Sequence, residues 1–238
     1  SSHSKEGSLV DFNRAGMPLM ELVTKPVIKD SVQALKFAKE LQLLLRYLNA
    51  SDADMEKGQM RVEANISISP KKLLGRKKLG TKVELKNINS FKAVKDAVAF
   101  EIDRQTKLLD EGGEVVQETR GWDEVKKETF SQRIKEGSAD YRYMPEPDLP
   151  PIDFEAEGSI NLKEIKDSLP ELPWQKRERF AKEYGFESGS DELERLIDDV
   201  GEAAFFESFA SEVKNSGGGD DAIKLGINYL DSDLIGIM

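Results

Sequence analysis

Cysteine is absent from this 238-residue chain, and histidine occurs only once, as His3. Without cysteine the chain can form neither a disulfide nor a thiolate metal site. Because the only histidine lies near the first residue, a Ser-His-Asp triad within the chain is not expected. The P-loop, the dinucleotide-binding fingerprint and the Gly-x-Ser-x-Gly motif are missing as well. An enzyme built from this chain would therefore work through carboxylates, lysine and arginine, amides or a hard metal ion.

Long hydrophobic runs are also missing. No apolar stretch approaches the roughly 18 residues needed to cross a bilayer, so we expect no membrane partner. The polar start, SSHSKEGS, does not resemble a signal peptide. Hydrophobic residues make up 38% and charged residues 34% of the chain, a balance typical of a soluble protein with a core. Because the chain does not begin with Met and stops without a terminating signal, we expect it to be part of a longer protein.

Negative charge is concentrated towards the C-terminus. Residues 151–238 hold 9 Lys and Arg against 21 Asp and Glu, a net charge of −12, whereas residues 1–150 hold 26 against 24, a net charge of +2. The overall charge of −10 therefore does not exclude a nucleic-acid partner for the first part. Its densest basic run, residues 71–78 (KKLLGRKK), is consistent with a solvated hairpin loop or with contact to a nucleic-acid backbone.

Hydrophobic periodicity predicts two long helices and four strands in the first part. Asp30 or Ser31 can cap the start of the first helix, Ser90 is the expected N-cap of the second, and Gly112 and Gly113 end the second helix. Short strands interleaved with long helices indicate an α+β fold, with helices on one face of an antiparallel sheet. The predicted helices span residues 31–48 and 90–109, and the predicted strands span residues 61–69, 81–88, 114–122 and 128–134.

A proline cluster at residues 144–151 (MPEPDLPP) interrupts this pattern. Proline continues neither a helix interior nor a central strand, so the cluster is interpreted as a domain boundary. Beyond it the pattern is helical throughout. The expected helices span residues 161–169, 173–185, 190–198, 201–214 and 219–230.

The polar faces of the first two strands form one candidate site. Mixed charges and amides across an antiparallel pair can line a wet cavity and bind Mg²⁺ or phosphate. The alternative is a solvated sheet face with cross-strand ion pairs. The residues concerned are Glu63, Asn65 and Ser67 on the first strand, and Lys82, Glu84 and Lys86 on the second.

Glu21 is a second candidate, since it is a lone carboxylate inside the apolar run MPLMELV. A buried carboxylate is costly unless it is paired or bound to a metal. The alternative is a sheet edge at which Glu21 points to water.

The segment DYRY, residues 140–143, is a third candidate. Aromatic side chains around an arginine can stack on a base or a ribose. The alternative is an amphipathic segment whose tyrosine rings pack under a loop.

Six blocks in this order resemble the B-subunit family of the aspartyl/glutamyl-tRNA(Asn/Gln) amidotransferases. Together they cover roughly residues 3–154, and an archaeal relative that acts only on Glu-tRNA(Gln) shares parts of the pattern. The blocks are residues 8–24 (SLVDFNRAGMPLMELVT), 51–58 (SDADMEKG), 61–67 (RVEANIS), 80–91 (GTKVELKNINSF), 113–120 (GEVVQETR) and 140–151 (DYRYMPEPDLPP).

The resemblance implies a glutamine-synthetase-like, antiparallel-sheet cradle domain followed by an all-helical domain. In this chain the cradle would occupy residues 1–154 and the helical domain residues 155–238. The resemblance further implies two protein partners, the amidase (A-type) subunit of the complex and its small (C-type) subunit, and a cytoplasmic location.

The implied reaction has two steps and uses ATP and Mg²⁺. The side-chain carboxylate of Glu-tRNA(Gln) or Asp-tRNA(Asn) is first phosphorylated. Ammonia, made from glutamine by the amidase subunit, then displaces phosphate to give the amide. The chemistry requires this order, because a carboxylate does not react with ammonia until it carries a good leaving group.

Residue by residue, the resemblance assigns Glu21 as a Mg²⁺ ligand of the kinase site and as a catalytic residue. Glu63 matches an acidic position along the ammonia path, where the family typically has Asp, and is the second catalytic candidate. The positions expected to line the pocket for ATP or the tRNA 3′ end are Asn13, Arg14, Asn65, Lys82, Lys86, Asn87 and Asn89.

Two other functions stay open at this point. Glu63 in place of Asp, and Lys57 where an acidic residue is common, are compatible with a non-catalytic tRNA-binding scaffold in the same complex. An unrelated acidic module that binds a protein partner is the third possibility. ATP use and association with the amidase subunit distinguish the three.

Overall fold

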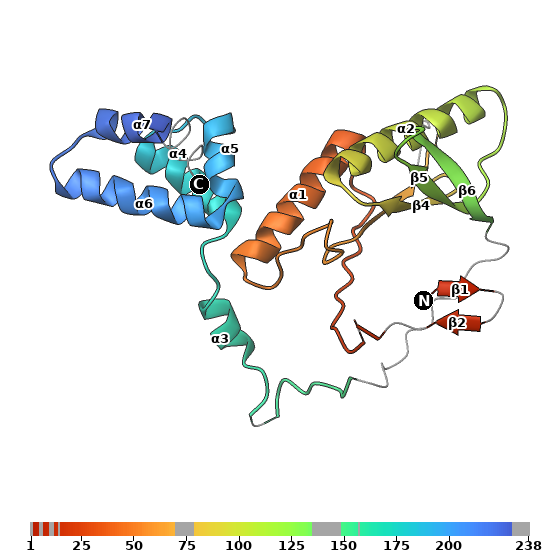
Figure 1. Cartoon of the computed structure of the whole chain (residues 1–238), viewed down its shortest axis with the longest axis horizontal. Coiled ribbons are helices and arrows are strands. Elements are labelled where there is room, and N and C mark those ends of the chain that lie inside the picture. The colour runs from red at the N-terminus through yellow and green to blue at the C-terminus, as the bar shows by residue number, and fades with distance from the viewer. Residues whose placement is uncertain are drawn as a thin grey trace, which may run out of the picture.

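The computed structural model describes residues 2–4, 7–9, 12–13, 15–69, 79–134, 149–156 and 158–229. Within these residues the chain forms a four-stranded sheet with two long helices, a short N-terminal hairpin, and a helical region that follows the sheet (Figure 1). In chain order the elements are β1 (Ser2–Ser4), β2 (Gly7–Leu9), α1 (Ser31–Tyr47), β3 (Val62–Ile66), β4 (Val83–Ile88), α2 (Phe91–Asp110), β5 (Glu118–Asp123), β6 (Glu128–Ile134), α3 (Leu162–Asp167), α4 (Pro173–Tyr184), α5 (Asp191–Asp198), α6 (Val200–Asn215) and α7 (Asp220–Tyr229).

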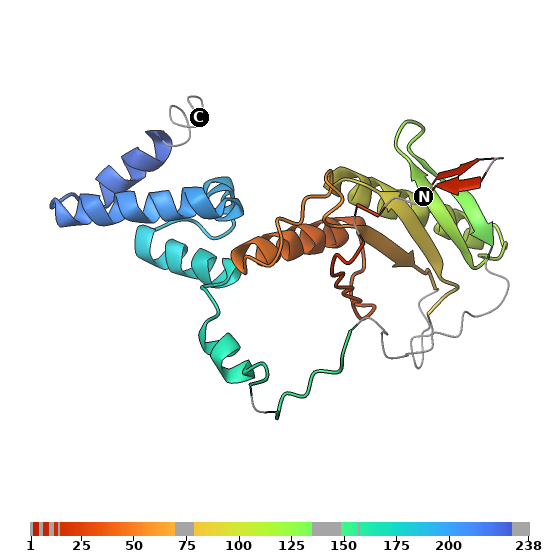
Figure 2. The same cartoon turned by 60° about the horizontal axis from the view of Figure 1, so that its bottom comes forward.

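Both long helices begin where the sequence predicts. The side chain of Asp30 accepts a hydrogen bond from the backbone of Gln33 at the start of α1, and Ser90 does the same for Ala93 at the start of α2. Each cap satisfies a backbone N–H that has no partner within the first turn. The two helices pack against each other, and α2 also contacts β3, β4 and β6 (Figure 2).

The sheet has the order β3-β4-β5-β6, and its pairing differs from the expected one at one place. The β3–β4 and β5–β6 pairs are antiparallel, but β4 and β5 are parallel. The expectation of an antiparallel sheet is therefore wrong for the central pair. The reason lies in the connection: α2 carries the chain from β4 back to the start of β5, and a helical crossover joins parallel neighbours.

The sheet and α2 share one hydrophobic core. Val83 and Leu85 of β4 are completely buried, and they pack with Val94 and Ala97 of α2. Trp122 of β5 completes this layer, with its ring edge-on to Phe100 at a centroid distance of 6.2 Å. Alternation along β4 consequently turns Glu84 and Lys86 to the opposite face of the sheet.

The later helices match the expected spans closely and form a second core. Phe180 of α4 and Phe206 of α6 are fully buried with ring centroids 5.5 Å apart. Leu43 and Tyr47, at the end of α1, belong to this same core. The helical region therefore docks on the last turns of α1, while Ala34 near the start of α1 packs in the sheet core.

Two features of the N-terminal part were not expected from the sequence. The β1–β2 hairpin is one. The other is the stretch from residue 17 to residue 28, which has no regular secondary structure and exposes most of its large apolar side chains. None of the helices in the described ranges is both long and apolar enough to cross a bilayer.

Candidate functional site on the open face of the sheet

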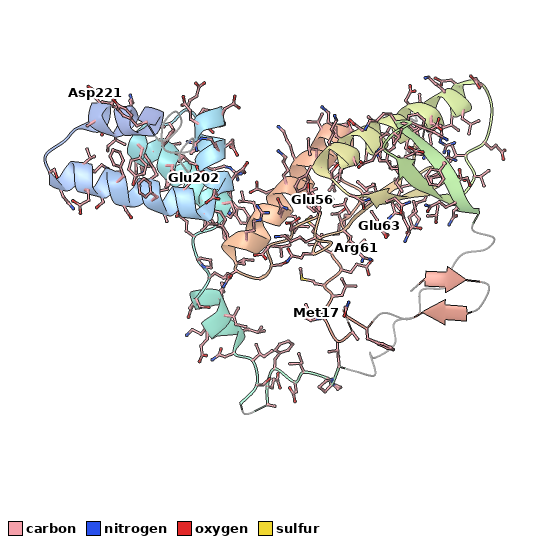
Figure 3. All side chains as sticks on the ribbon, viewed as in Figure 1. Met17, Glu56, Arg61, Glu63, Glu202 and Asp221 are labelled. Atoms are coloured by element: carbon pink, nitrogen blue, oxygen red, sulfur yellow. The ribbon has the colours of Figure 1, made fainter. Side chains whose placement is uncertain are left out.

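The face of the sheet that points away from α2 carries the polar side chains of β3 and β4. Glu63 and Asn65 are exposed there, whereas Ile66 of the same strand is buried towards the helix. Figure 3 shows Glu63 and Arg61 on the side of the sheet opposite α1 and α2. No described helix packs on this surface, which is called the open face.

A β-bulge shapes the open face where the edge strand β3 pairs with β4. Val62 pairs with Ile88 and Ala64 with Leu85, so Glu63 alone lies opposite two residues of β4. One of these two, Asn87, has a φ of 62°, in the left-handed region. Asparagine tolerates that region better than most residues, and bulges of this kind turn side chains near functional sites.

The bulge brings Lys86 and Glu63 together. The ammonium nitrogen Nζ of Lys86 lies 3.0 Å from Oε1 of Glu63 and 3.8 Å from Oε1 of Glu84. The hydroxyl of Thr119 on β5 donates to Oε2 of Glu84 at 3.0 Å. Lys86 is 40% and Glu63 49% exposed, so both charges remain accessible to a ligand from solvent.

This arrangement suits a polar substrate. The carboxylate of Glu63 can accept a proton, or a hydrogen bond from an N–H group. The ammonium of Lys86 can donate a hydrogen bond to an anionic oxygen. Of the residues singled out in the sequence, the structure brings together Glu63, Asn65, Lys86 and Asn87 on the open face. Lys82 and Asn89 are exposed at the two ends of β4.

Glu21 lies elsewhere, in the stretch before α1, and it is exposed. Of the two alternatives for Glu21, burial does not hold, since its apolar neighbours Met20 and Leu22 are themselves 70% and 52% exposed; Glu21 points to water, but from an irregular stretch and not from a sheet edge. Asn13 is exposed in the segment before it. Arg14, the basic run at residues 71–78 and the DYRY motif lie outside the described residues.

A Mg²⁺ site needs several oxygen ligands. Glu21 offers one carboxylate, and nowhere in the described ranges do three His, Cys, Asp or Glu side chains come together as a metal site would require. Glu63 and Glu84 both flank Lys86. Because Mg²⁺ is usually held by one or two carboxylates together with waters and substrate phosphates, the Mg²⁺ site expected at Glu21 stays a prediction.

A buried polar network lies beneath the sheet, and the sequence pattern did not predict it. Glu101 of α2 is completely buried and accepts hydrogen bonds from Arg104, Gln105 and Thr129. Arg120 of β5 lies 3.7 Å from the same carboxylate. The hydrogen bond and charge of Glu101 raise the pKa of Arg104 against the opposing effect of burial, so this guanidinium stays charged.

The same network continues to β6 through Glu118. Burial tends to raise the pKa of this carboxyl, but hydrogen bonds from Ser131 and Arg120 outweigh burial and lower it. Arg120 donates to Glu118 at 2.6 Å and to the backbone oxygen of Thr129 at 2.7 Å. One helix and two strands are thus held at fixed positions behind the open face.

Gln105 fixes the edge strand β3, which carries Glu63 and Asn65. Its side-chain oxygen accepts from the backbone N–H of Ile68 at 3.2 Å, and its Nε2 lies 3.4 Å from the carbonyl oxygen of Ile66. Glu101 and Gln105 follow Val98 at helical spacing, on the side of α2 that is buried. Two polar residues in this apolar stripe were the signal by which the sequence could have indicated a buried polar network.

The fold and the site define a class of protein: a mixed α/β protein with an ion-paired polar site on an open sheet. A more particular assignment comes from comparison with known proteins. The profile of the family described as "GatB/GatE catalytic domain" matches residues 1–159, more than half of the chain. The chain therefore belongs to this family.

Individual relatives agree with the assignment. A protein of Persephonella marina is 49% identical over 209 residues, which cover 88% of this chain and 42% of the relative. A protein of Crocosphaera subtropica is 44% identical over 95% of this chain and 43% of its own length. A protein of Caldicellulosiruptor saccharolyticus is 50% identical over 76% of this chain and 36% of its own length. All three are named as the B subunit of aspartyl/glutamyl-tRNA(Asn/Gln) amidotransferase. The chain spans less than half the length of these relatives.

Proposed function

We propose that this chain is the catalytic part of a B subunit that converts Glu-tRNA(Gln) or Asp-tRNA(Asn) into Gln-tRNA(Gln) or Asn-tRNA(Asn). Membership of the family supports the proposal, as do the relatives that carry this name. The observation that carries it within the structure is the bulge that pairs Lys86 with Glu63 on the open face.

The proposed chemistry has two balanced steps. The side-chain carboxylate of the aminoacyl group attacks the γ-phosphorus of ATP, forming an acyl phosphate and releasing ADP. Ammonia then attacks the acyl carbon, inorganic phosphate leaves with the bonding electrons, and the nitrogen loses a proton. Glutamine would supply the ammonia through the amidase partner, so the reaction would be that of a glutamine-dependent ligase.

Within this scheme Glu63 acts at the second step. Its carboxylate is exposed, is oriented by the ammonium of Lys86, and can accept the proton that the attacking nitrogen gives up. Lys86 can then hydrogen-bond the oxygen of the departing phosphate or of the acyl group. Asn65 and Asn87, which are exposed on the same strands, would orient the aminoacyl end of the tRNA.

The remaining assignments rest on the family resemblance. Glu21 would contribute one ligand to Mg²⁺, together with groups outside the described residues, and the ion would offset the charge of the ATP phosphates. Asn13, Arg14, Lys82 and Asn89 would contact ATP or the tRNA 3′ end. The amidase and the small C-type protein would be the partners in a cytoplasmic heterotrimer. The division into a cradle at residues 1–154 and a helical domain at residues 155–238 belongs to the same proposal.

A non-catalytic tRNA-binding scaffold is the alternative. It is compatible with the ion pairs of Lys86 with Glu63 and Glu84, because such pairs also occur on solvated sheet faces with no chemistry, so the measured reaction has to separate the two.

The deciding experiment uses the full-length protein in complex with its partners and separates the two steps. Glu-tRNA(Gln), ATP, Mg²⁺ and ammonium are supplied, and ADP release and amide formation are measured side by side. Glu63→Gln is expected to lower amide formation by about 100-fold while ADP release continues, because only the proton acceptor is lost. Glu21→Ala is expected to lower both.

The control is Asp103→Asn on α2, whose carboxylate forms an exposed ion pair with Lys107 away from the open face. It should leave both rates unchanged. A wild-type complex that binds tRNA but releases no ADP would favour the scaffold. Equal rates for wild type and Glu63→Gln would remove Glu63 from the mechanism.

A further inference from the structure

Four residues stand side by side across the open face, one on each strand. Lys86 of β4 pairs with Gly121 of β5, and Gly121 pairs with Phe130 of β6. Glu63 of β3 completes the row through its hydrogen bond with Lys86. Because neighbouring strands are about 4.8 Å apart, Phe130 stands about 10 Å from the strand that carries Lys86.

The ring of Phe130 lies across the sheet. A Cβ atom placed on Gly121 would lie only 2.6 Å from Cζ and 2.9 Å from Cε1 of this ring. The ring therefore occupies the space that a side chain at position 121 would need. Since Phe130 is 42% exposed, part of the ring remains open to solvent.

The surroundings of the ring are polar. Nε2 of Gln132 would lie 2.5 Å from the same added Cβ, so its amide sits over Gly121 beside the ring. Thr119, two residues before Gly121 on β5, and Lys86 lie on the same face. Among the described residues, the Phe130 ring is surrounded by amide, hydroxyl and ammonium groups; this apolar surface is too small for a protein partner and suits a planar ligand with a polar edge.

We propose that Phe130 is a stacking platform for a purine base and that Gln132 hydrogen-bonds the edge of that base. The inference rests on the proposed function, in which two ligands bring an adenosine to this face: ATP and the 3′ end of the tRNA. Their shared chemistry is the adenine ring. Every base has a π-face that can stack on an aromatic side chain, and an amide can both donate to and accept from a base edge.

The competing explanation is that the ring only covers the glycine. An aromatic side chain over a strand glycine stabilises a sheet without any ligand. Phe130→Tyr keeps the cover and the stacking surface, whereas Phe130→Leu keeps apolar bulk but removes the aromatic plane. Phe37→Leu on α1 is the matched control, because Phe37 is 39% exposed and lies away from the open face.

The test uses the full-length protein in complex with its partners and measures equilibrium binding of four probes. These are ATP, inorganic tripolyphosphate, deacylated tRNA, and the same tRNA without its terminal adenosine. Phe130→Leu is expected to lower the binding affinity for one adenosine-bearing probe by about 10- to 100-fold. Phe130→Tyr is expected to lower it by less than about threefold. Tripolyphosphate and the shortened tRNA should bind all variants equally, and Phe37→Leu should bind every probe like wild type.

Each outcome has one meaning. A loss confined to ATP identifies the nucleotide as the source of the base, and a loss confined to intact tRNA identifies its 3′ end. Unchanged binding of both in Phe130→Leu, or an equal loss for tripolyphosphate, overturns the platform. If that happens while the wild-type complex still forms amide, the proposed function stands without it. A wild-type complex that neither binds ATP nor forms amide overturns both.

Discussion

Single residues behind the open face hold its geometry through ion pairs and hydrogen bonds. Glu118 is the clearest case, because its side chain is only 10% exposed and meets Arg120 at 2.6 Å. Its carboxylate also accepts a hydrogen bond from Ser131 across the β5–β6 pair. Gln105 plays a comparable part at the other edge of the sheet through the backbone of Ile66 and Ile68.

Glu118 should make stability depend on pH in acid. Hydrogen bonds from Ser131 and Arg120 lower its folded-state pKa below the ordinary value of 4.5, against the effect of burial. A carboxyl whose pKa is lower in the folded state than in the unfolded state stabilises the fold at pH values above its unfolded-state pKa. This stability is lost as the pH falls through the folded-state pKa. Glu118→Gln is therefore expected to cost about 1–2 kcal/mol at neutral pH and progressively less below about pH 4.5.

Urea unfolding of wild type and Glu118→Gln across a pH series measures this difference directly. Taking the difference between the two proteins cancels the titration of carboxyls that both share. Two curves that run parallel down to about pH 3 would contradict the assigned role of Glu118.

At the scale of elements, the bulge in β4 decides where Lys86 and Asn87 stand. Asn87 has a φ of 62° inside a strand, a conformation that β-branched residues rarely adopt. The register of β3 against β4 depends on it, because Glu63 must face two residues instead of one.

Substitutions at Asn87 should separate backbone conformation from side-chain chemistry. Asn87→Gly is expected to keep the bulge with little change in stability, since glycine adopts positive φ freely. Asn87→Val is expected to cost about 1–2 kcal/mol and to displace Lys86 from Glu63. Thermal unfolding gives the stabilities, and the rate of amide formation reports the site.

The comparison also tests the role of the Asn87 side chain. If Asn87→Gly folds like wild type but loses activity, the amide itself contacts substrate. If Asn87→Val folds and works like wild type, the strand does not need the left-handed residue, and the bulge is not a functional device.

At the scale of the whole molecule, α1 joins two cores. Its beginning packs with the sheet through Ala34, and its end packs with α4–α7 through Leu43 and Tyr47. The hydroxyl of Tyr47 donates to the backbone oxygen of Ile197 at 3.0 Å, and burial raises the pKa of this phenol to about 12. Arg177 of α4 reinforces the junction with an ion pair to Glu40 of α1 at 2.8 Å.

Two matched deletions should show how far the cores are independent. Leu43→Ala is expected to cost about 2–4 kcal/mol and to speed hydrogen exchange in α4–α7 and at the end of α1. Leu85→Ala removes the same apolar side-chain atoms from the sheet core and should instead speed hydrogen exchange in β3–β6 and α2. Mass spectrometry of exchange in the full-length protein distinguishes the two patterns, and uniform loosening by either variant would mean that the cores unfold as one.

Much of the local structure could be predicted from the sequence alone. The capping residues Asp30 and Ser90, the spacing of apolar residues and the glycines after α2 place the helices within a residue or two, because these signals act within one or two turns. The β3–β4 pair and the shared face of Glu63 and Asn65 follow from strict alternation. The family resemblance was likewise carried by the order of short sequence blocks.

Only the tertiary structure decided which residues meet. The parallel β4–β5 pair follows from the crossover through α2, and the contact of Lys86 with Glu63 depends on a one-residue bulge that alternation does not reveal. Burial of Glu101 and Gln105 depends on partners that are distant in sequence, namely Thr129 and the backbone of Ile66. The sequence left open whether Glu21 is buried or points to water from a sheet edge; it is exposed, but in a stretch that is not a strand, because burial is set by what packs over a segment and not by its own composition.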